Sequence, residues 1–80
     1  MLVITRQIRA ARSLIGWEQQ HLATSAGVAV STVRRIEGLD GPIAAHFETI
    51  EKIRRAFDHA GVEFLSEPTP GVRLKDVAKS

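Results

Sequence analysis

The sequence has no cysteine among its 80 residues, which excludes disulfide bonds, a thiolate nucleophile and cysteine-ligated zinc. It also has no apolar run of about 18 residues, the length that a membrane-spanning helix needs. The apolar stretch at its start is too short for a signal peptide. These absences predict a cytoplasmic protein.

Residue patterns that carry catalysis or metal binding are also missing. Three histidines, His21, His46 and His59, are scattered along the chain without the spacing of a zinc site. There is no glycine-rich phosphate loop, and no set of serine, histidine and aspartate that a small fold would bring together in an obvious pocket. We therefore expect no enzyme activity, no cofactor and no metal.

The composition is that of one small folded domain, with 44% hydrophobic and 25% charged residues. Its net charge of +2 is unevenly distributed. Residues 1–38 carry five arginines against two glutamates, a net of +3, whereas residues 39–60 sum to −1 and residues 61–80 to zero. This excess of arginine in the first half favours contact with phosphate. The alternative is chance asymmetry on a solvated surface.

Residues 19–37 have the apolar spacing of two short helices joined by a tight turn. Leu22, Ala23 and Ala26 share one helical face, and Val33 and Ile36 share another. The register changes between these two groups at Gly27. A glycine can adopt the positive φ that ends a helix, and Ala23 is small enough to let a second helix cross closely. Ala29 or Val30 would begin that helix.

This packing leaves a polar and basic face on the second helix, and the chemistry of that face suits a DNA groove. Arginine can bond guanine through two hydrogen bonds, valine can contact a thymine methyl group, and serine can bond a base or a phosphate. We predict Arg34 as the main base reader. Arg35 would read a base or bind the backbone. The predicted face comprises Val30, Ser31, Thr32, Arg34 and Arg35. If the residues around them are left out of account, Arg34 and Arg35 are more simply interpreted as two solvated charges on the surface of a helix.

The pattern resembles the helix-turn-helix of phage-repressor-like bacterial regulators, often called the Xre or Cro type. The matching positions are Gln19 first, Ala23 fifth, Gly27 ninth, Val33 fifteenth and Ile36 eighteenth. The flanks at residues 16–23 and 34–38 are also similar, and the likeness covers about residues 8–60. It implies an all-α, lambda-repressor-like bundle of four to five short helices, here with a C-terminal extended or β-hairpin tail.

The same resemblance implies roles for residues around the motif. Arg12 and Glu37 match a structural salt bridge between the first helix and the recognition helix, and Gln19 matches a glutamine that bonds a phosphate or a partner side chain. Glu18 departs from the family, which usually has serine or threonine there. Gly38 comes one place earlier than the family's loop glycine, and the loop contacts that the family implies are Gly38, Asp40 and Gly41.

Two further helices are predicted from apolar stripes. The first covers residues 5–14, with Thr5 as its cap, Gly16 as its end and a stripe of Ile4, Ile8, Ala11 and Ile15. Trp17 should cover the junction with the next helix. The last helix covers residues 44–60 and ends at Gly61. Its predicted core stripe is Phe47, Ile50, Ile53, Phe57 and Ala60.

The sequence divides into a helix-turn-helix domain at residues 1–61 and a tail at residues 62–80. Two short runs of strand character, at residues 62–65 and 71–75, flank a proline-containing segment. We predict a hairpin or two extended arms, whose apolar side chains would cover the helical core of the same chain or a second subunit. The predicted dimerisation residues are Val62, Phe64, Leu65, Val72 and Leu74.

These features predict a sequence-specific regulator of transcription that binds double-stranded DNA. A homodimer, acting as a repressor or autoregulator, would bring two recognition helices to a palindromic operator. The alternative is a protein-interaction module, such as an antitoxin or anti-activator, whose tail binds a partner protein.

Overall fold

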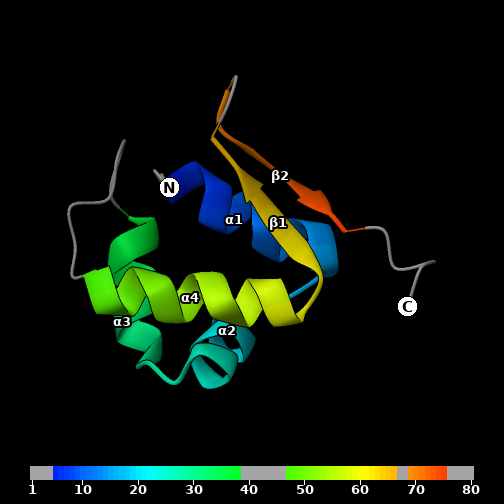
Figure 1. Ribbon diagram of the computed structural model, residues 1–80. Coiled ribbons are helices and arrows are strands. Elements are labelled where there is room, and N and C mark those ends of the chain that lie inside the picture. Colours follow the sequence, from blue (N-terminus) through cyan, green and yellow to red (C-terminus); the bar gives the residue numbers. More distant parts are fainter. Residues whose placement is uncertain (1–4, 39–46, 67–68, 76–80) are drawn as a thin grey trace.

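The computed structural model describes residues 5–38, 47–66 and 69–75. These residues form a mostly helical structure that ends in a small antiparallel hairpin (Figure 1). The elements in chain order are α1 (Thr5–Ile15), α2 (Gln19–Ala26), α3 (Val30–Glu37), α4 (Phe47–His59), β1 (Val62–Leu65) and β2 (Gly71–Leu74). Within these ranges, no helix has the length and apolar character needed to cross a membrane.

Helix α1 confirms the first predicted helix to within one residue at its end. Ile8 and Ala11 are completely buried, and Ile15 packs against the edge of the core. Gly16 has a φ of 70°, the left-handed conformation that terminates the helix. Thr5 is the first residue of the helix rather than the cap before it, and its hydroxyl donates to the carbonyl of Ile36 at 3.2 Å. Ile4 lies outside the described residues.

Helix α4 contributes the largest fully buried side chain, that of Phe57, but leaves Phe47, a predicted core residue, exposed. Ile53 and Phe57 are buried as predicted, and Ala56 is buried beside them. Phe47, at the start of the helix, is 77% exposed. The apolar spacing identifies the correct face, since Ile53 and Phe57 are buried on it, but spacing alone does not show which turns of the helix are covered. Residues 44–46 of the predicted helix lie outside the described residues.

The predicted hairpin is present, with β1 and β2 paired antiparallel from Val62 opposite Leu74 to Leu65 opposite Gly71. It packs against the helices of its own chain, with β2 against α1 and β1 against α4. Gln7 of α1 is 3% exposed, and its amide donates to the carbonyls of Leu65 at 2.8 Å and Gly71 at 3.0 Å. One side chain therefore holds both strands at the end near their connection.

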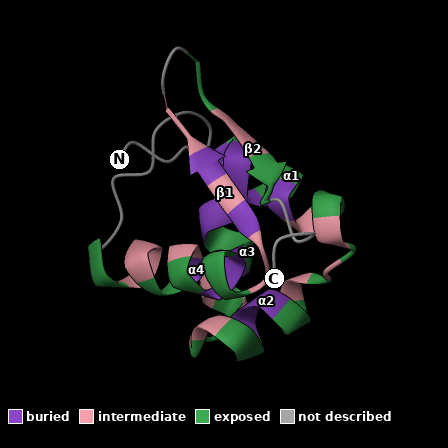
Figure 2. Cartoon of the chain, turned by 45° about the vertical axis from the view of Figure 1, so that its right-hand side comes forward, coloured by how far each residue is buried: buried purple, intermediate pink, exposed green. Residues whose placement is uncertain are grey.

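A single core joins all the elements, and Figure 2 shows the buried positions on the inward sides of helices and hairpin. Val62 is 2% exposed and Phe64 is 6% exposed. The ring of Phe64 lies 5.7 Å from that of Phe57 in α4. The sequence left open whether the tail covers its own core or a second subunit. Val62 and Phe64 belong to the core of their own chain, and Val72 packs against it.

Candidate DNA-binding surface

The turn between α2 and α3 depends on the backbone conformation of Gly27. Its φ of 73° and ψ of 35° are left-handed, a conformation that costs residues with a Cβ about 1–2 kcal/mol. The N–H groups of Gly27 and Val28 both donate to the carbonyl of Ala23, at 2.9 and 3.0 Å. Ala29 is extended and serves as the N-cap of α3. The predicted helix, turn and helix are all present at the predicted residues.

Helix α3 has one face in the core and one face in solvent. Val33, Ile36 and Glu37 are exposed by 0, 1 and 4% respectively. Ser31, Arg34 and Arg35 are exposed, while Val30 and Thr32 are half-buried at the border between the faces. The structure thus brings the five residues of the predicted DNA-reading face onto the outer side and borders of one short helix.

The carboxylate of Glu37 binds α1 and α2 to the end of α3. Arg12 donates from Nε to Oε2 at 2.7 Å and from Nη2 to Oε1 at 2.8 Å. Gln19 donates from Nε2 to Oε1 at 2.9 Å. The hydrogen bonds from Arg12 to the Glu37 carboxylate raise the pKa of the Arg12 guanidinium above its ordinary value, although partial burial of the guanidinium opposes this rise. The implied salt bridge is present, and Gln19 adds a hydrogen bond to the same carboxylate.

Two further side chains from α1 bind the last carbonyl groups of α3, which have no partner within the helix. Thr5 donates to the carbonyl of Ile36, and Arg9 donates from Nη1 to the carbonyl of Glu37 at 2.9 Å. No local pattern predicts either contact, because each joins residues about 30 positions apart in the sequence. Together with the Glu37 carboxylate, they fix α3 on α1.

An aromatic stack holds α2 against α4. Trp17 lies parallel to His21 at a centroid distance of 4.3 Å and stacks on Phe57 at 5.5 Å. The carbonyl of Trp17 also accepts a hydrogen bond from Nη1 of Arg12 at 3.0 Å. Trp17 was predicted to cover the junction of the first two helices. It contacts α2 as well as the core ring of α4, so it positions the whole helix-turn-helix on the rest of the fold.

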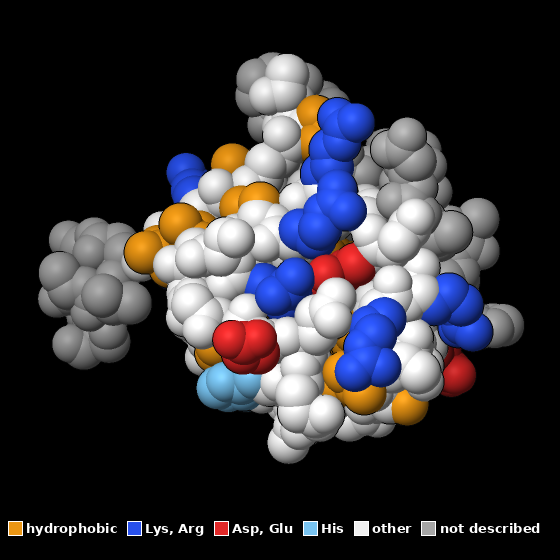
Figure 3. All heavy atoms as spheres, turned by 180° about the vertical axis from the view of Figure 1, so that it is seen from behind, with side chains coloured by type: hydrophobic (Ala, Val, Ile, Leu, Met, Phe, Trp, Pro, Cys, Tyr) orange, Lys and Arg blue, Asp and Glu red, His pale blue; other side chains and the backbone are white. Residues whose placement is uncertain are grey.

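A shallow groove of about 400 Å³ runs between the start of α2 and the outer face of α3. Its lining combines both charges with polar and apolar groups: Arg12, Glu18, Gln19, Gln20, Val30 and Arg34. Figure 3 shows Lys and Arg side chains that run from the top of this view to its centre, with separate basic groups to the left and right and acidic side chains beside them. Glu18 is exposed and makes no capping hydrogen bond to α2.

The predicted contacts after α3 are only partly described. Gly38 has right-handed backbone angles, with φ −81° and ψ −10°, and its N–H closes the helix on the carbonyl of Arg34 at 3.0 Å. Asp40 and Gly41 lie outside the described residues. Comparison with protein-family models and with curated proteins found no match for the sequence.

Proposed function

We propose that this protein is a sequence-specific regulator of transcription that binds double-stranded DNA through α3, in the manner of phage-repressor-like helix-turn-helix proteins. The observation that carries the proposal is the outer face of α3. Its exposed Ser31, Arg34 and Arg35 belong to a helix whose opposite face is in the core. In this interpretation the described helices are the lambda-repressor-like bundle.

The fixed position of α3 supports base reading. Recognition of a base edge requires a side chain whose backbone is held in place, because each specific contact has a defined geometry. The Glu37 carboxylate and the two carbonyl contacts from α1 provide this support at the C-terminal end of α3. The turn at Gly27 and the stacking of Trp17 support α3 indirectly, because they hold α2, which precedes it.

Each residue of the α3 surface has a proposed role. Arg34 reads guanine, Val30 contacts a thymine methyl group, and Ser31 bonds a base or a phosphate. Arg35 and Thr32 lie at the flanks and contact the backbone. Gln19 has two roles in this proposal. Its amide donates to Glu37, and its position at the start of α2 allows it to contact a phosphate. Its contact with DNA stays a prediction.

Regulation would be steric. Two copies on an inverted repeat would place two α3 helices in major grooves about one helical turn apart and exclude polymerase from the promoter. Because arginines neutralise phosphates, affinity should fall steeply with salt, by ~10³–10⁵ between 50 and 200 mM if about 6–10 phosphates are contacted.

The test is selection of binding sites from a random pool of double-stranded DNA at moderate salt. An enriched inverted repeat with half-site centres about 10 bp apart is the expected result. A folded protein that retains no DNA even at low salt would contradict the proposal. Such a result would favour the protein-interaction module, with the hairpin as the surface to examine.

A further inference from the structure

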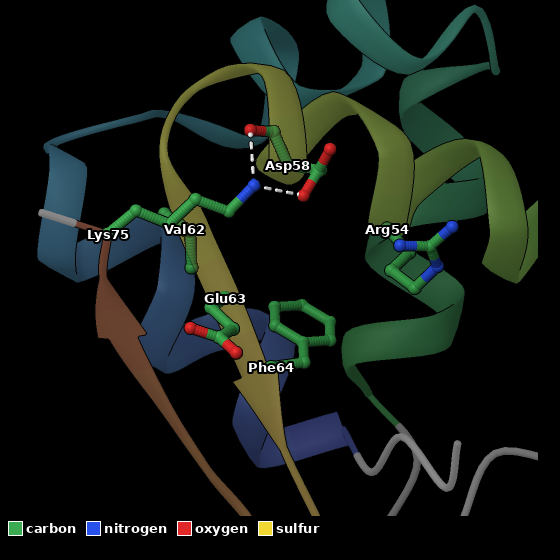
Figure 4. A pocket seen from close by; sticks show the side chains of 6 residues that line it. All are labelled: Arg54, Asp58, Val62, Glu63, Phe64 and Lys75. Carbon is green, nitrogen blue, oxygen red and sulfur yellow. Dashed lines mark hydrogen bonds and ion pairs between the residues drawn. The ribbon is translucent and has the colours of Figure 1, made fainter. Parts of the chain in front are cut away.

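A pocket of about 370 Å³ lies between α4 and β1. Figure 4 shows β2 on one side of β1 and the pocket residues Phe64 and Arg54 on the other. The volume is within the range of small-molecule sites. The lining side chains come from α4, from β1 and from the residue that follows β2: Arg54, Asp58, Val62, Glu63, Phe64 and Lys75.

The backbone of β1 presents polar groups to the side away from β2. Lys75 donates its backbone N–H to the carbonyl of Gly61 at 2.7 Å, so these two residues are a directly hydrogen-bonded pair. Such pairs alternate along an antiparallel ladder. Glu63 therefore points its backbone groups at β2, whereas Val62 and Phe64 point theirs away from it. Within the described ranges, no group bonds the outward N–H and C=O groups of these two residues.

These outward groups belong to a buried part of the strand, because Val62 and Phe64 are both in the core. A buried N–H or C=O group without a partner costs free energy, so nearly all such groups in proteins are hydrogen-bonded. Phe64 also lines the pocket. A ligand that carries a donor and an acceptor a few atoms apart would bond both outward groups of Phe64.

The pocket lining has two cations and two carboxylates, and each of them keeps one hydrogen-bonding position unused. Arg54 binds a glutamate of its own helix through Nε and Nη2, which leaves Nη1. Lys75 donates to the carbonyl and to Oδ1 of Asp58, as Figure 4 shows, which leaves its third N–H and the second carboxylate oxygen. Glu63 accepts from Arg73 at Oε1, which leaves Oε2. Two donors and two acceptors therefore remain among the described charged groups of the lining.

This balance of charge disfavours a ligand of one sign. An anion would approach the carboxylates of Asp58 and Glu63, which repel it. A cation would likewise approach Arg54 and Lys75. A ligand with one positive and one negative group satisfies both sets through charge-assisted hydrogen bonds. The ring of Phe64 offers an apolar surface to the rest of such a molecule.

We infer that this pocket binds a free α-amino acid with an apolar side chain. The ammonium group donates to the carbonyl of Phe64 and to Oε2 of Glu63, and the carboxylate accepts from the N–H of Phe64 and from Arg54. The two charged groups of an amino acid are joined through one carbon atom. They therefore meet the C=O and N–H of one strand residue as the opposite residue of a ladder does. The apolar side chain lies against the ring of Phe64.

Titration of the isotope-labelled full chain with amino acids tests the inference. The probes are L-valine, L-leucine, L-methionine and L-phenylalanine, which share the two charges and differ in the size of the apolar side chain. The expected result is a saturable shift of the Phe64 amide signal in the nuclear magnetic resonance spectrum. The melting temperature should rise with the concentration of the same amino acid, because a ligand of the folded state stabilises it by mass action. No saturable shift with any of the four at millimolar concentration would overturn the inference.

Analogues of leucine test whether both charges are needed. 4-Methylpentanoate keeps the apolar side chain and the carboxylate, and 3-methylbutylamine keeps the side chain and the ammonium group. Each should bind at least tenfold more weakly than leucine. N-Acetyl-L-leucinamide has the N–H and C=O groups of a peptide without either charge, and it should also bind at least tenfold more weakly. Equal affinity for the amide would assign the pocket to an extended peptide, and equal affinity for a singly charged analogue would remove the second charged contact. Either result would refute the inference.

Two substitutions with matched controls test the charged contacts, with the strongest-binding of the four amino acids as the ligand. Arg54→Gln should weaken binding at least fivefold, while Arg55→Gln should not, because Arg55 is exposed on α4 outside the pocket lining. Glu63→Gln should also weaken binding, with Glu48→Gln on α4 as its control. Circular dichroism shows that each variant is folded. Unchanged affinity in both Arg54→Gln and Glu63→Gln would contradict the inference.

The pocket is separate from the proposed DNA-binding surface, since its lining shares no residue with the groove between α2 and α3. A protein that binds an amino acid here but selects no DNA would leave the site in place and refute the regulator. A protein that selects a specific DNA sequence but responds to none of the four amino acids would refute the site alone.

Discussion

Arg12 and Glu37, which are 25 residues apart in the sequence, form a two-pronged ion pair that joins α1 to the last residue of α3. The carboxylate side is 4% exposed and the guanidinium side is 20% exposed. Burial of two charges costs solvation free energy, so the net contribution of the pair to stability can be near zero. Its value to the molecule is the fixed placement of α3.

Removal of one partner should nevertheless destabilise the fold strongly. Arg12→Met leaves the buried carboxylate of Glu37 with only the Gln19 amide as a side-chain partner. We expect the free energy of unfolding in urea to fall by about 3–5 kcal/mol. The double variant with Glu37→Leu should recover most of that loss, because no charge is then buried alone. Equal stability of Arg12→Met and the natural protein would show that Glu37 is solvated.

The glycines that follow α2 and α3, Gly27 and Gly38, offer a matched pair of substitutions. Gly27→Ala should lower stability by about 1–2 kcal/mol, since the φ of 73° is strained for any residue with a Cβ. Steric contact is not the cause, because nothing lies within 4 Å of the added atom. Gly38→Ala should change stability by less than about 1 kcal/mol, since its backbone is right-handed. Thermal unfolding of both variants provides the measurement, and a larger loss at Gly38 would contradict the prediction.

Glu18 should weaken DNA binding by this protein. Its exposed carboxylate lines the groove that also holds Gln19 and Arg34, where it would repel a phosphate. A like charge about 4 Å away costs about 1 kcal/mol in water, so Glu18→Gln should tighten binding about fivefold at low salt. Glu48→Gln, which removes an exposed carboxylate from α4, should not. Fluorescence anisotropy at two salt concentrations would measure this, and weaker binding by Glu18→Gln would show that the carboxylate contacts a base.

The contact between Asp58 and Lys75 should make stability depend on pH on the acid side. The hydrogen bond from Lys75 holds the pKa of the Asp58 carboxyl below its ordinary value. A lowered pKa in the folded state contributes stability above the unfolded pKa, and this contribution is lost as pH falls through the folded pKa. The melting temperatures of the natural protein and Asp58→Asn should therefore differ most near neutral pH and converge in acid. A difference that stays constant with pH would contradict this assignment.

The helix-turn-helix could be predicted from sequence because its signals are local. Gly27 marks the turn, and the spacing of Leu22, Ala23, Val33 and Ile36 assigns each helix its buried face. All four of these apolar residues are 0 or 1% exposed in the structure. The Arg12–Glu37 pair followed from the resemblance, since nothing in the spacing alone relates two charges 25 residues apart.

The features that could not be predicted depend on contacts between residues that lie far apart in the sequence. Gln7 and Thr5 are polar yet buried, because their partners are backbone carbonyls of the hairpin and of α3. Phe47 has the spacing of a core residue but is 77% exposed, because periodicity does not show which turn of a helix the rest of the fold covers. The hairpin's position on α1 and α4 also required the structure, since two short apolar strands fit either their own core or a second subunit.

The central claim is that Arg34 reads a base from the outer face of α3. The most direct measurement compares Arg34→Ala with Arg55→Ala, an exposed arginine of α4, on the selected DNA site and on the same site changed at each position in turn. The account predicts that Arg34→Ala costs about 1–3 kcal/mol of binding and removes discrimination at one guanine position, while Arg55→Ala preserves discrimination at every position. Full discrimination at every position by Arg34→Ala would contradict the claim.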